Sequence, residues 1–192
     1  MTRIIAGFAG SLRLTVPAGA TRPTSDRTRE GIFSALDARG VLAGARVLDL
    51  FAGSGALGLE AASRGAALVH LVDSSAAAAT ACKRNAKTVA ASPRAPKDLR
   101  LLVTRQTADT FLGQDTDSYD VVFLDPPYDL TTAEINRTLA LVAARVAPAG
   151  VVVLERSTRS TDPTLPDALV LDRARDYGDT RVFYADAAPS AE

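Results

Sequence analysis

The sequence has very few of the residues that form disulfides or bind zinc. Its 192 residues include one cysteine, Cys82, and one histidine, His70. A single thiol cannot form an internal disulfide, and this pair is too few for a structural zinc site. No run approaches the roughly 18 consecutive apolar residues of a membrane-spanning helix, and the first residues lack the apolar core of a signal peptide. We therefore expect a cytoplasmic protein without a metal centre or a membrane segment.

The chain also lacks net charge, because 22 Lys and Arg residues balance 22 Asp and Glu residues. The balance hides an uneven distribution. Residues 1–46 contain seven arginines and three acidic residues, a net charge of +4, which leaves −4 for the rest of the chain. A basic segment beside an acidic body is typical of a surface that binds nucleic acid, although solvated arginines on a helix face give the same count.

Apolar runs alternate with helical stretches from residue 46 onward, and this alternation predicts a doubly wound α/β fold around a parallel sheet. Two later runs flank the turn Tyr177-Gly178-Asp179, which predicts a final antiparallel strand pair. The predicted strands are 47–51, 68–73, 99–103, 119–125, 151–155, 168–171 and 180–184, and the predicted helices are 26–38, 56–64, 76–91 and 132–146.

The domain organisation follows from the same pattern. A β-hairpin from residues 3–6 and 12–16, followed by a helix, forms an N-terminal extension over residues 1–40. The alternating region forms the main domain, residues 41–186. The small and polar residues 187–192 predict a disordered tail.

A glycine-rich turn follows the first strand of the main domain. Gly53, Gly55 and Gly58 form G-x-G-x-x-G between a strand and a helix, the context in which this motif holds a ligand. Glycines let the backbone turn tightly, and the helix N-terminus offers N–H groups to negative charge. Asp73 ends the next strand, where a carboxylate can bind ribose hydroxyls. These residues allow NAD or a nucleoside cofactor without a pyrophosphate.

Asp49 favours the second kind of cofactor. It lies four residues before Gly53, where its carboxylate would crowd a pyrophosphate but could pair with a cation. S-adenosylmethionine carries a sulfonium, an ammonium and an adenosine. The stretch 49–55 resembles the cofactor motif of class I methyltransferases that methylate amino groups. That resemblance assigns Asp73 to the ribose and Asp109 to the adenine amino group, with a helix N-cap as the alternative for Asp109. It assigns the cofactor's other contacts to Asp49, Phe51, Ala52, Gly53, Ser54 and Gly55.

Asp125-Pro126-Pro127-Tyr128 follows the fourth predicted strand, at the same sheet edge as the glycine turn. An exocyclic amine of a nucleobase is a poor nucleophile because its lone pair is delocalised into the ring. Hydrogen bonds from the amine to Asp125 and to the Pro126 carbonyl would localise that lone pair. The two prolines fix this carbonyl, and Tyr128 can stack on a base taken out of its helix. We therefore predict that these four residues are catalytic.

Four segments together resemble the RsmD family, namely 3–7, 21–33, 47–66 and 125–128. The resemblance implies a seven-stranded sheet and methylation of N2 of guanine 966 in 16S ribosomal RNA. The substrate would be presented in the small ribosomal subunit or its assembly intermediate. Candidates for contact with RNA, or for holding a lid over the cofactor, are Arg22, Thr24, Arg27 and Arg29. The alternative is that they cap the start of the helix and that Arg29 pairs with a nearby carboxylate. Where family members carry consecutive arginines after Gly10, this chain has Ser11-Leu12-Arg13, which weakens the expected phosphate grip.

Three other functions are compatible with parts of the pattern. The same motif order serves DNA adenine-N6 methylation, but 192 residues leave no room for a separate target-recognition domain. The glycine pattern alone fits an NAD-dependent oxidoreductase. A non-enzymatic RNA-binding assembly factor is the third alternative. His70 and Cys82 are expected to be structural.

Overall fold

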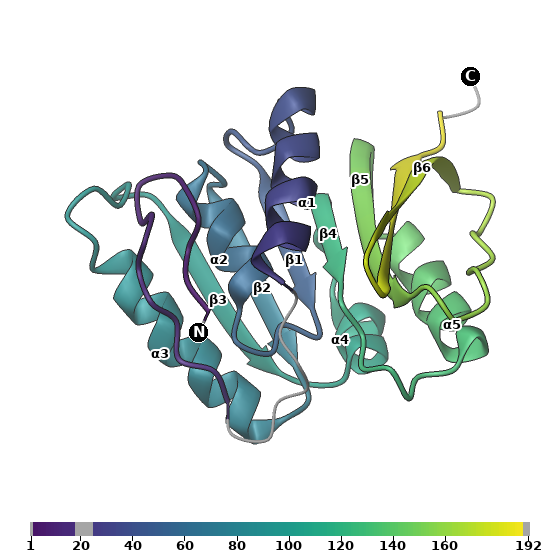
Figure 1. The fold of residues 1–192 in the computed structure, drawn as a ribbon, viewed down its shortest axis with the longest axis horizontal. Coiled ribbons are helices and arrows are strands. Elements are labelled where there is room, and N and C mark those ends of the chain that lie inside the picture. The colour runs from purple at the N-terminus through teal and green to yellow at the C-terminus, as the bar shows by residue number, and fades with distance from the viewer. Residues whose placement is uncertain (1, 18–24, 190–192) are drawn as a thin grey trace.

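The computed structural model describes residues 2–17 and 25–189 and contains one seven-stranded sheet with the strand order β3-β2-β1-β4-β5-β7-β6 (Figure 1). The strands are β1 Arg46–Leu50, β2 Leu68–Asp73, β3 Arg100–Arg105, β4 Tyr119–Leu124, β5 Val146–Ser157, β6 Leu169–Tyr177 and β7 Thr180–Ala187. The helices are α1 Asp26–Arg39, α2 Ala56–Ser63, α3 Ala76–Ala90, α4 Ala108–Gln114 and α5 Thr132–Ala143.

The sheet is doubly wound, as the alternating pattern predicts. Strands β1 to β5 pair in parallel, whereas β7 is antiparallel to both β5 and β6. Helices α1, α2 and α3 cover one face over a core that includes Val121 and Phe123 of β4. Helices α4 and α5 cover the other face, over a core that includes Val122 and Leu124. Alternate side chains of each strand therefore enter opposite cores.

The N-terminal extension pairs where the sequence predicts a hairpin, but it does not form regular strands. A single antiparallel bridge joins Arg3 and Arg13, and the Ile4 N–H donates to the Leu12 carbonyl at 2.9 Å. The backbone of this strap, residues 2–17, instead turns toward α2. There the N–H groups of Ile5 and Ala6 donate to the buried Glu60 carboxylate at 2.6 and 3.0 Å. Those donors would be needed to extend a hairpin ladder.

The C-terminal boundary also differs from the sequence prediction. Ala187 pairs with Leu169 as the last residue of β7, and the Ala188 N–H donates to the Ala168 carbonyl at 2.8 Å. The tail predicted to be disordered from residue 187 is therefore wrong for its first two residues, because the β6–β7 ladder continues over them. Residues 190–192 lie outside the described part of the chain. Within that part, none of the helices combines the length and the apolar character that a membrane crossing requires.

Arg29 does not have the position expected of an RNA contact. The sequence makes it a candidate for RNA contact, but its side chain has no exposed surface. Its guanidinium donates to the Arg3 carbonyl at 2.9 Å and to the Asp26 carboxylate at 2.6 Å. A buried cation is tolerated when it is paired and hydrogen-bonded. Arg29 therefore joins α1 to the strap rather than facing a ligand.

We predict that Arg29→Ala lowers the free energy of unfolding by about 3 kcal/mol, because it leaves a cavity and removes the partner of a buried carbonyl. Arg27→Ala is the matched control, since Arg27 is exposed two residues earlier on the same helix and should change stability by less than about 0.5 kcal/mol. Urea unfolding of both variants measures the difference. Equal stabilities would mean that Arg29 does not hold α1 in place.

Candidate active site

The glycine turn between β1 and α2 is held by the strand next to it. Phe51, Gly53 and Gly55 have positive φ values of 62°, 57° and 77°, so the backbone folds sharply back before the helix begins. The Gly53 N–H donates to the Asp73 carboxylate at 2.8 Å, and the Ser75 N–H donates to the other oxygen of the same carboxylate at 2.8 Å. Asp73 therefore fixes the turn, and each of its oxygens keeps a further lone pair for a ligand.

Asn85 of α3 holds the glycine turn through hydrogen bonds. Its amide donates to the Ser54 carbonyl and to the Thr15 carbonyl, each at 2.8 Å, and accepts from the Thr15 N–H at 2.9 Å. The Cys82 thiol of the same helix donates to the Gly53 carbonyl at 3.4 Å. The side chain of Asn85 is 2% exposed, so one buried amide joins the strap to the glycine turn. Sequence analysis missed this role, for which the only signal is a polar residue on a buried helix face.

Asp49 lies beneath the turn and is almost completely buried. Its carboxylate accepts a 2.8 Å hydrogen bond from the Gly58 N–H in the first turn of α2. The pKa of Asp49 is raised to about 8, chiefly by burial; the Gly58 hydrogen bond opposes this rise, and the nearby Asp125 and Asp73 carboxylates add to it. Asp49 thus holds the start of α2, while its predicted pairing with a cofactor cation stays a prediction.

The carboxyl ends of β2 and β4 bring two carboxylates, Asp73 and Asp125, to one sheet edge. Leu50 of β1 pairs with Val72 and with Leu124, so the glycine turn leaves the sheet between Asp73 and Asp125. Side chains alternate between the two faces along β4, so Asp125 lies on the same face as Val121 and Phe123, the face covered by α1 to α3. The sequence prediction that the glycine turn and Asp125 share one edge is confirmed.

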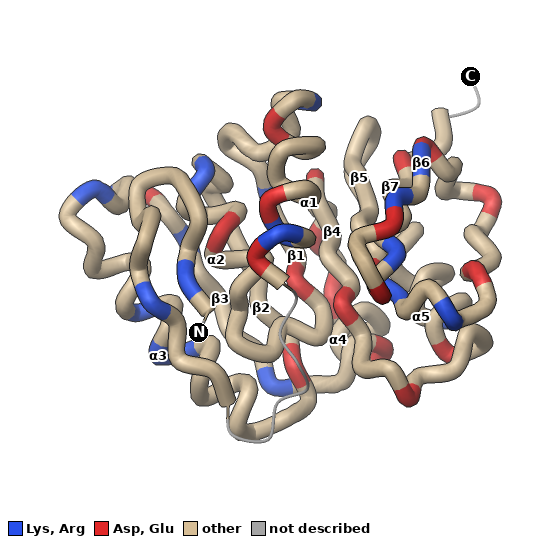
Figure 2. The backbone as a smooth tube through the Cα atoms, viewed as in Figure 1, with Lys and Arg blue, Asp and Glu red and all other residues tan. Residues whose placement is uncertain are grey.

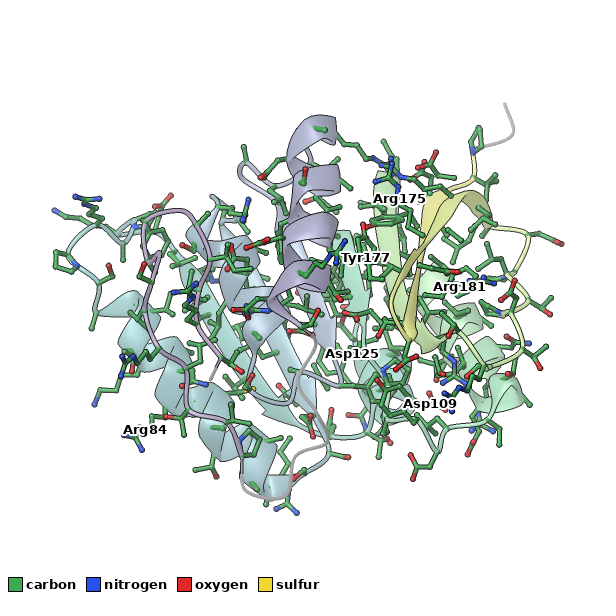
Figure 3. All side chains as sticks on the ribbon, viewed as in Figure 1. Arg84, Asp109, Asp125, Arg175, Tyr177 and Arg181 are labelled. Atoms are coloured by element: carbon green, nitrogen blue, oxygen red, sulfur yellow. The ribbon has the colours of Figure 1, made fainter. Side chains whose placement is uncertain are left out.

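A cavity of about 430 Å³ opens in front of Asp125. Its walls are residues 125–128, residues 155–156 of β5, residues 176–180 at the β6–β7 turn, and Ser25, Arg27 and Thr28 at the start of α1. Figure 3 shows Asp125 and Tyr177 between α1 and the β6–β7 hairpin. Gly31 of α1 permits this closeness, since a Cβ there would lie 2.4 Å from the Tyr177 ring. Tyr128 is 63% exposed at the rim.

The remaining predicted site residues divide among three places. Arg27 is exposed and contributes to the cavity wall. Asp109 does not line this cavity. Its carboxylate accepts from Arg137 at 3.0 Å and from Thr138 at 2.6 Å, both on α5. Arg22 and Thr24 lie outside the described residues, so their predicted RNA contacts stay predictions.

The basic segment predicted from residues 1–46 is largely paired with acidic residues. Ion pairs join Arg3 and Arg29 to Asp26, Arg39 to Asp186, and Arg46 to Asp117. Acidic and basic positions also lie interspersed along β6 and β7 (Figure 2). Asp26 is already included in the net charge of +4, so the pairs with Asp186 and Asp117 are the ones that offset part of that charge within the fold.

His70 lies between β3 and α4 and contacts a side chain of each. His70 Nε2 lies 2.8 Å from the Thr104 hydroxyl, and its ring packs edge-on against Phe111. Burial lowers the pKa of His70, which fits the predicted structural role. Over residues 2–17 and 25–189, no group of three or more His, Cys, Asp or Glu side chains has an arrangement that could hold a metal ion.

Comparisons with known proteins agree with this geometry. The family model described as "Conserved hypothetical protein 95" matches residues 2–186. The ribosomal RNA small subunit methyltransferase D of Escherichia coli K12 is 34% identical over 177 residues, which cover 92% of this chain and 85% of that protein.

Solved structures share the fold. A hypothetical protein from Thermus thermophilus has a TM-score of 0.80 with 30% identity, covering 96% of this chain and 98% of its own. Magnesium protoporphyrin IX methyltransferase from Synechocystis PCC 6803, solved with bound SAM, has a TM-score of 0.66 with 20% identity, covering 84% and 79%. The sheet is therefore that of the class I methyltransferases.

We predict that Asp49→Asn is stabilised relative to the unsubstituted chain as the pH rises. Folding raises the Asp49 pKa from 3.8 to about 8, so the folded chain keeps a proton that the unfolded chain releases above about pH 4. The stability from this group is complete at low pH and is lost as pH rises toward 8.

Asparagine cannot ionise, and its side-chain oxygen can still accept from Gly58. The free energy of unfolding of Asp49→Asn minus that of the unsubstituted chain should therefore be more than about 1 kcal/mol larger at pH 8 than at pH 5. Urea unfolding at both pH values measures the gain. A difference that is the same at pH 5 and pH 8 would show that folding leaves the Asp49 pKa unshifted.

Proposed function

We propose that this chain, which belongs to the RsmD family, transfers a methyl group from S-adenosylmethionine to N2 of guanine 966 in 16S ribosomal RNA. The observation that carries the proposal is the position of Asp125-Pro126-Pro127-Tyr128, which borders both the glycine turn and a cavity of about 430 Å³. The family relationship favours methyl transfer over hydride transfer.

The residues around the glycine turn fit S-adenosylmethionine. The positive φ values of Gly53 and Gly55 shape the turn. Apart from the chain neighbours of Gly53, the Phe51 carbonyl is the only group among the described residues that lies within 4 Å of where a Gly53 Cβ would be. Asp73, partly exposed beside it, offers carboxylate oxygens to ribose hydroxyls. We assign the ribose to Asp73 and the neighbouring contacts to the backbone of residues 51–55. When bound, the cofactor supplies an electrophilic methyl group.

Asp125 and Pro126 act on the target amine. The Asp125 carboxylate and the Pro126 carbonyl can each accept one N–H of the guanine 2-amino group, which directs the nitrogen lone pair toward the methyl carbon. Pro127 gives no N–H to compete for that position. Asp125 can also take up the proton that N2 releases when the new bond forms. Holding the two reactants in this geometry is the main source of acceleration.

The cavity suits a base that has left its helix. Tyr128 exposes an aromatic ring at the rim, and stacking of a base on such a ring is worth about 1–3 kcal/mol. Arg27 lies at the same rim and can meet a phosphate. Because so many other N-terminal arginines are paired within the fold, we propose the small ribosomal subunit or its assembly intermediate, rather than free RNA, as the substrate, and the cytoplasm as the site of action.

We predict that Asp125→Asn lowers kcat for methyl transfer at least about 100-fold and leaves binding of S-adenosylhomocysteine within about threefold. The assay incubates undermethylated small subunits with methyl-labelled S-adenosylmethionine, and calorimetry measures cofactor binding.

Asp98→Asn is the control for the charge change, because Asp98 is exposed in the loop before β3. Its rate should equal that of the unsubstituted enzyme. Labelling by Asp125→Asn at the full rate would refute the role of Asp125. Failure of the unsubstituted protein to label small-subunit RNA would refute the proposed function itself.

A further inference from the structure

A second carboxylate lies beside Asp125 and has no part in the chemistry described so far. Leu124 of β4 pairs in parallel with Leu154 of β5, so the next residues along the two strands, Asp125 and Glu155, are neighbours at the sheet edge. Paired strands lie about 4.8 Å apart. Phe123 and Val153 point into the core under α1, and alternation places Asp125 and Glu155 on that same face.

Glu155 belongs to the wall of the cavity while being only 3% exposed. A carboxylate held in this position is an acceptor at the inner end of the cavity rather than a charge in solvent. An ionised carboxylate has about four lone-pair sites, so Glu155 can bind groups of the protein and a donor of the ligand together. The next residue, Arg156, donates to the Leu130 carbonyl at 2.9 Å, which fixes β5 to the loop after Tyr128.

Two neighbouring acceptors match one edge of guanine. Guanine carries its 2-amino group next to N1–H, so two adjacent donors face outward from the ring. Adenine carries its 6-amino group next to an unprotonated N1, which is an acceptor. If Asp125 binds the amino group, the Glu155 carboxylate can accept a hydrogen bond from N1–H of guanine. In adenine the same carboxylate would face the lone pair of N1, which repels it. A site built to accept a hydrogen bond discriminates strongly against a ligand that lacks the donor.

We propose that Glu155 is the residue that selects guanine, by accepting the N1–H of the base whose amino group Asp125 holds. This inference rests on the proposed function and adds a specificity role to it. It also explains in physical terms why a chain with the Asp-Pro-Pro-Tyr motif would methylate guanine rather than adenine.

The decisive test compares guanine with 2-aminopurine at the target position of reconstituted small subunits. The two bases share the 2-amino group, but N1 of 2-aminopurine is an acceptor. The unsubstituted enzyme should prefer guanine in kcat/KM by at least about 10-fold. Glu155→Gln presents an N–H to that position. It should lose at least about 10-fold on guanine and lose nothing, or gain, on 2-aminopurine, so that the preference falls at least about 10-fold.

Glu134→Gln is the matched control, because Glu134 caps α5 away from the cavity and glutamine can serve in the same capping box. It should keep the guanine preference. Calorimetry with S-adenosylhomocysteine should give the same Kd for both variants as for the unsubstituted enzyme.

The possible outcomes separate the two proposals. An unchanged preference in Glu155→Gln, or an equal loss on both bases, would overturn the role of Glu155 while leaving the methyltransferase function intact. No methylation of guanine-bearing subunits by the unsubstituted enzyme would overturn the proposed function instead.

Discussion

The register between β1 and β4 is the constraint on which the site depends. Leu50 pairs with Leu124, so the glycine turn and Asp125 leave the sheet at the same level on adjacent strands. Because side chains alternate along a strand, a shift of one residue would turn Asp125 toward α4 and α5 and place Leu124 in front of the cavity. The buried Val, Leu and Phe side chains of both strands fix that register.

Contacts of α1, the strap and the β6–β7 turn complete the surroundings of the site. Arg29 joins α1 to the strap, Asn85 joins the strap to the glycine turn, and Tyr177 packs against Gly31. These contacts come from segments far apart in the sequence, yet all of them position the region around Asp125. The N-terminal extension is therefore part of the site's scaffold, and its polar groups are used mainly inside the protein.

The local sequence pattern predicted the strand–helix alternation, the glycine turn and the sheet edge shared by Gly53 and Asp125. Each of these depends on periodicity or on a short motif. The pattern could not predict that Arg29 would be buried, since that depends on contacts with Arg3, twenty-six residues away. Glu155 and Asn85 were missed for the same reason. A polar residue within an apolar run shows its role only when the register places it beside Asp125 or under the glycine turn.

The central claim is that this sheet edge places a guanine amine before an activated methyl group. It is tested most directly by mapping modified nucleotides in small-subunit ribosomal RNA from cells that lack this protein. The account predicts that one guanine, position 966, loses its N2 methyl group and regains it when the gene is restored. An RNA whose guanine methylation is the same with and without the protein would contradict it.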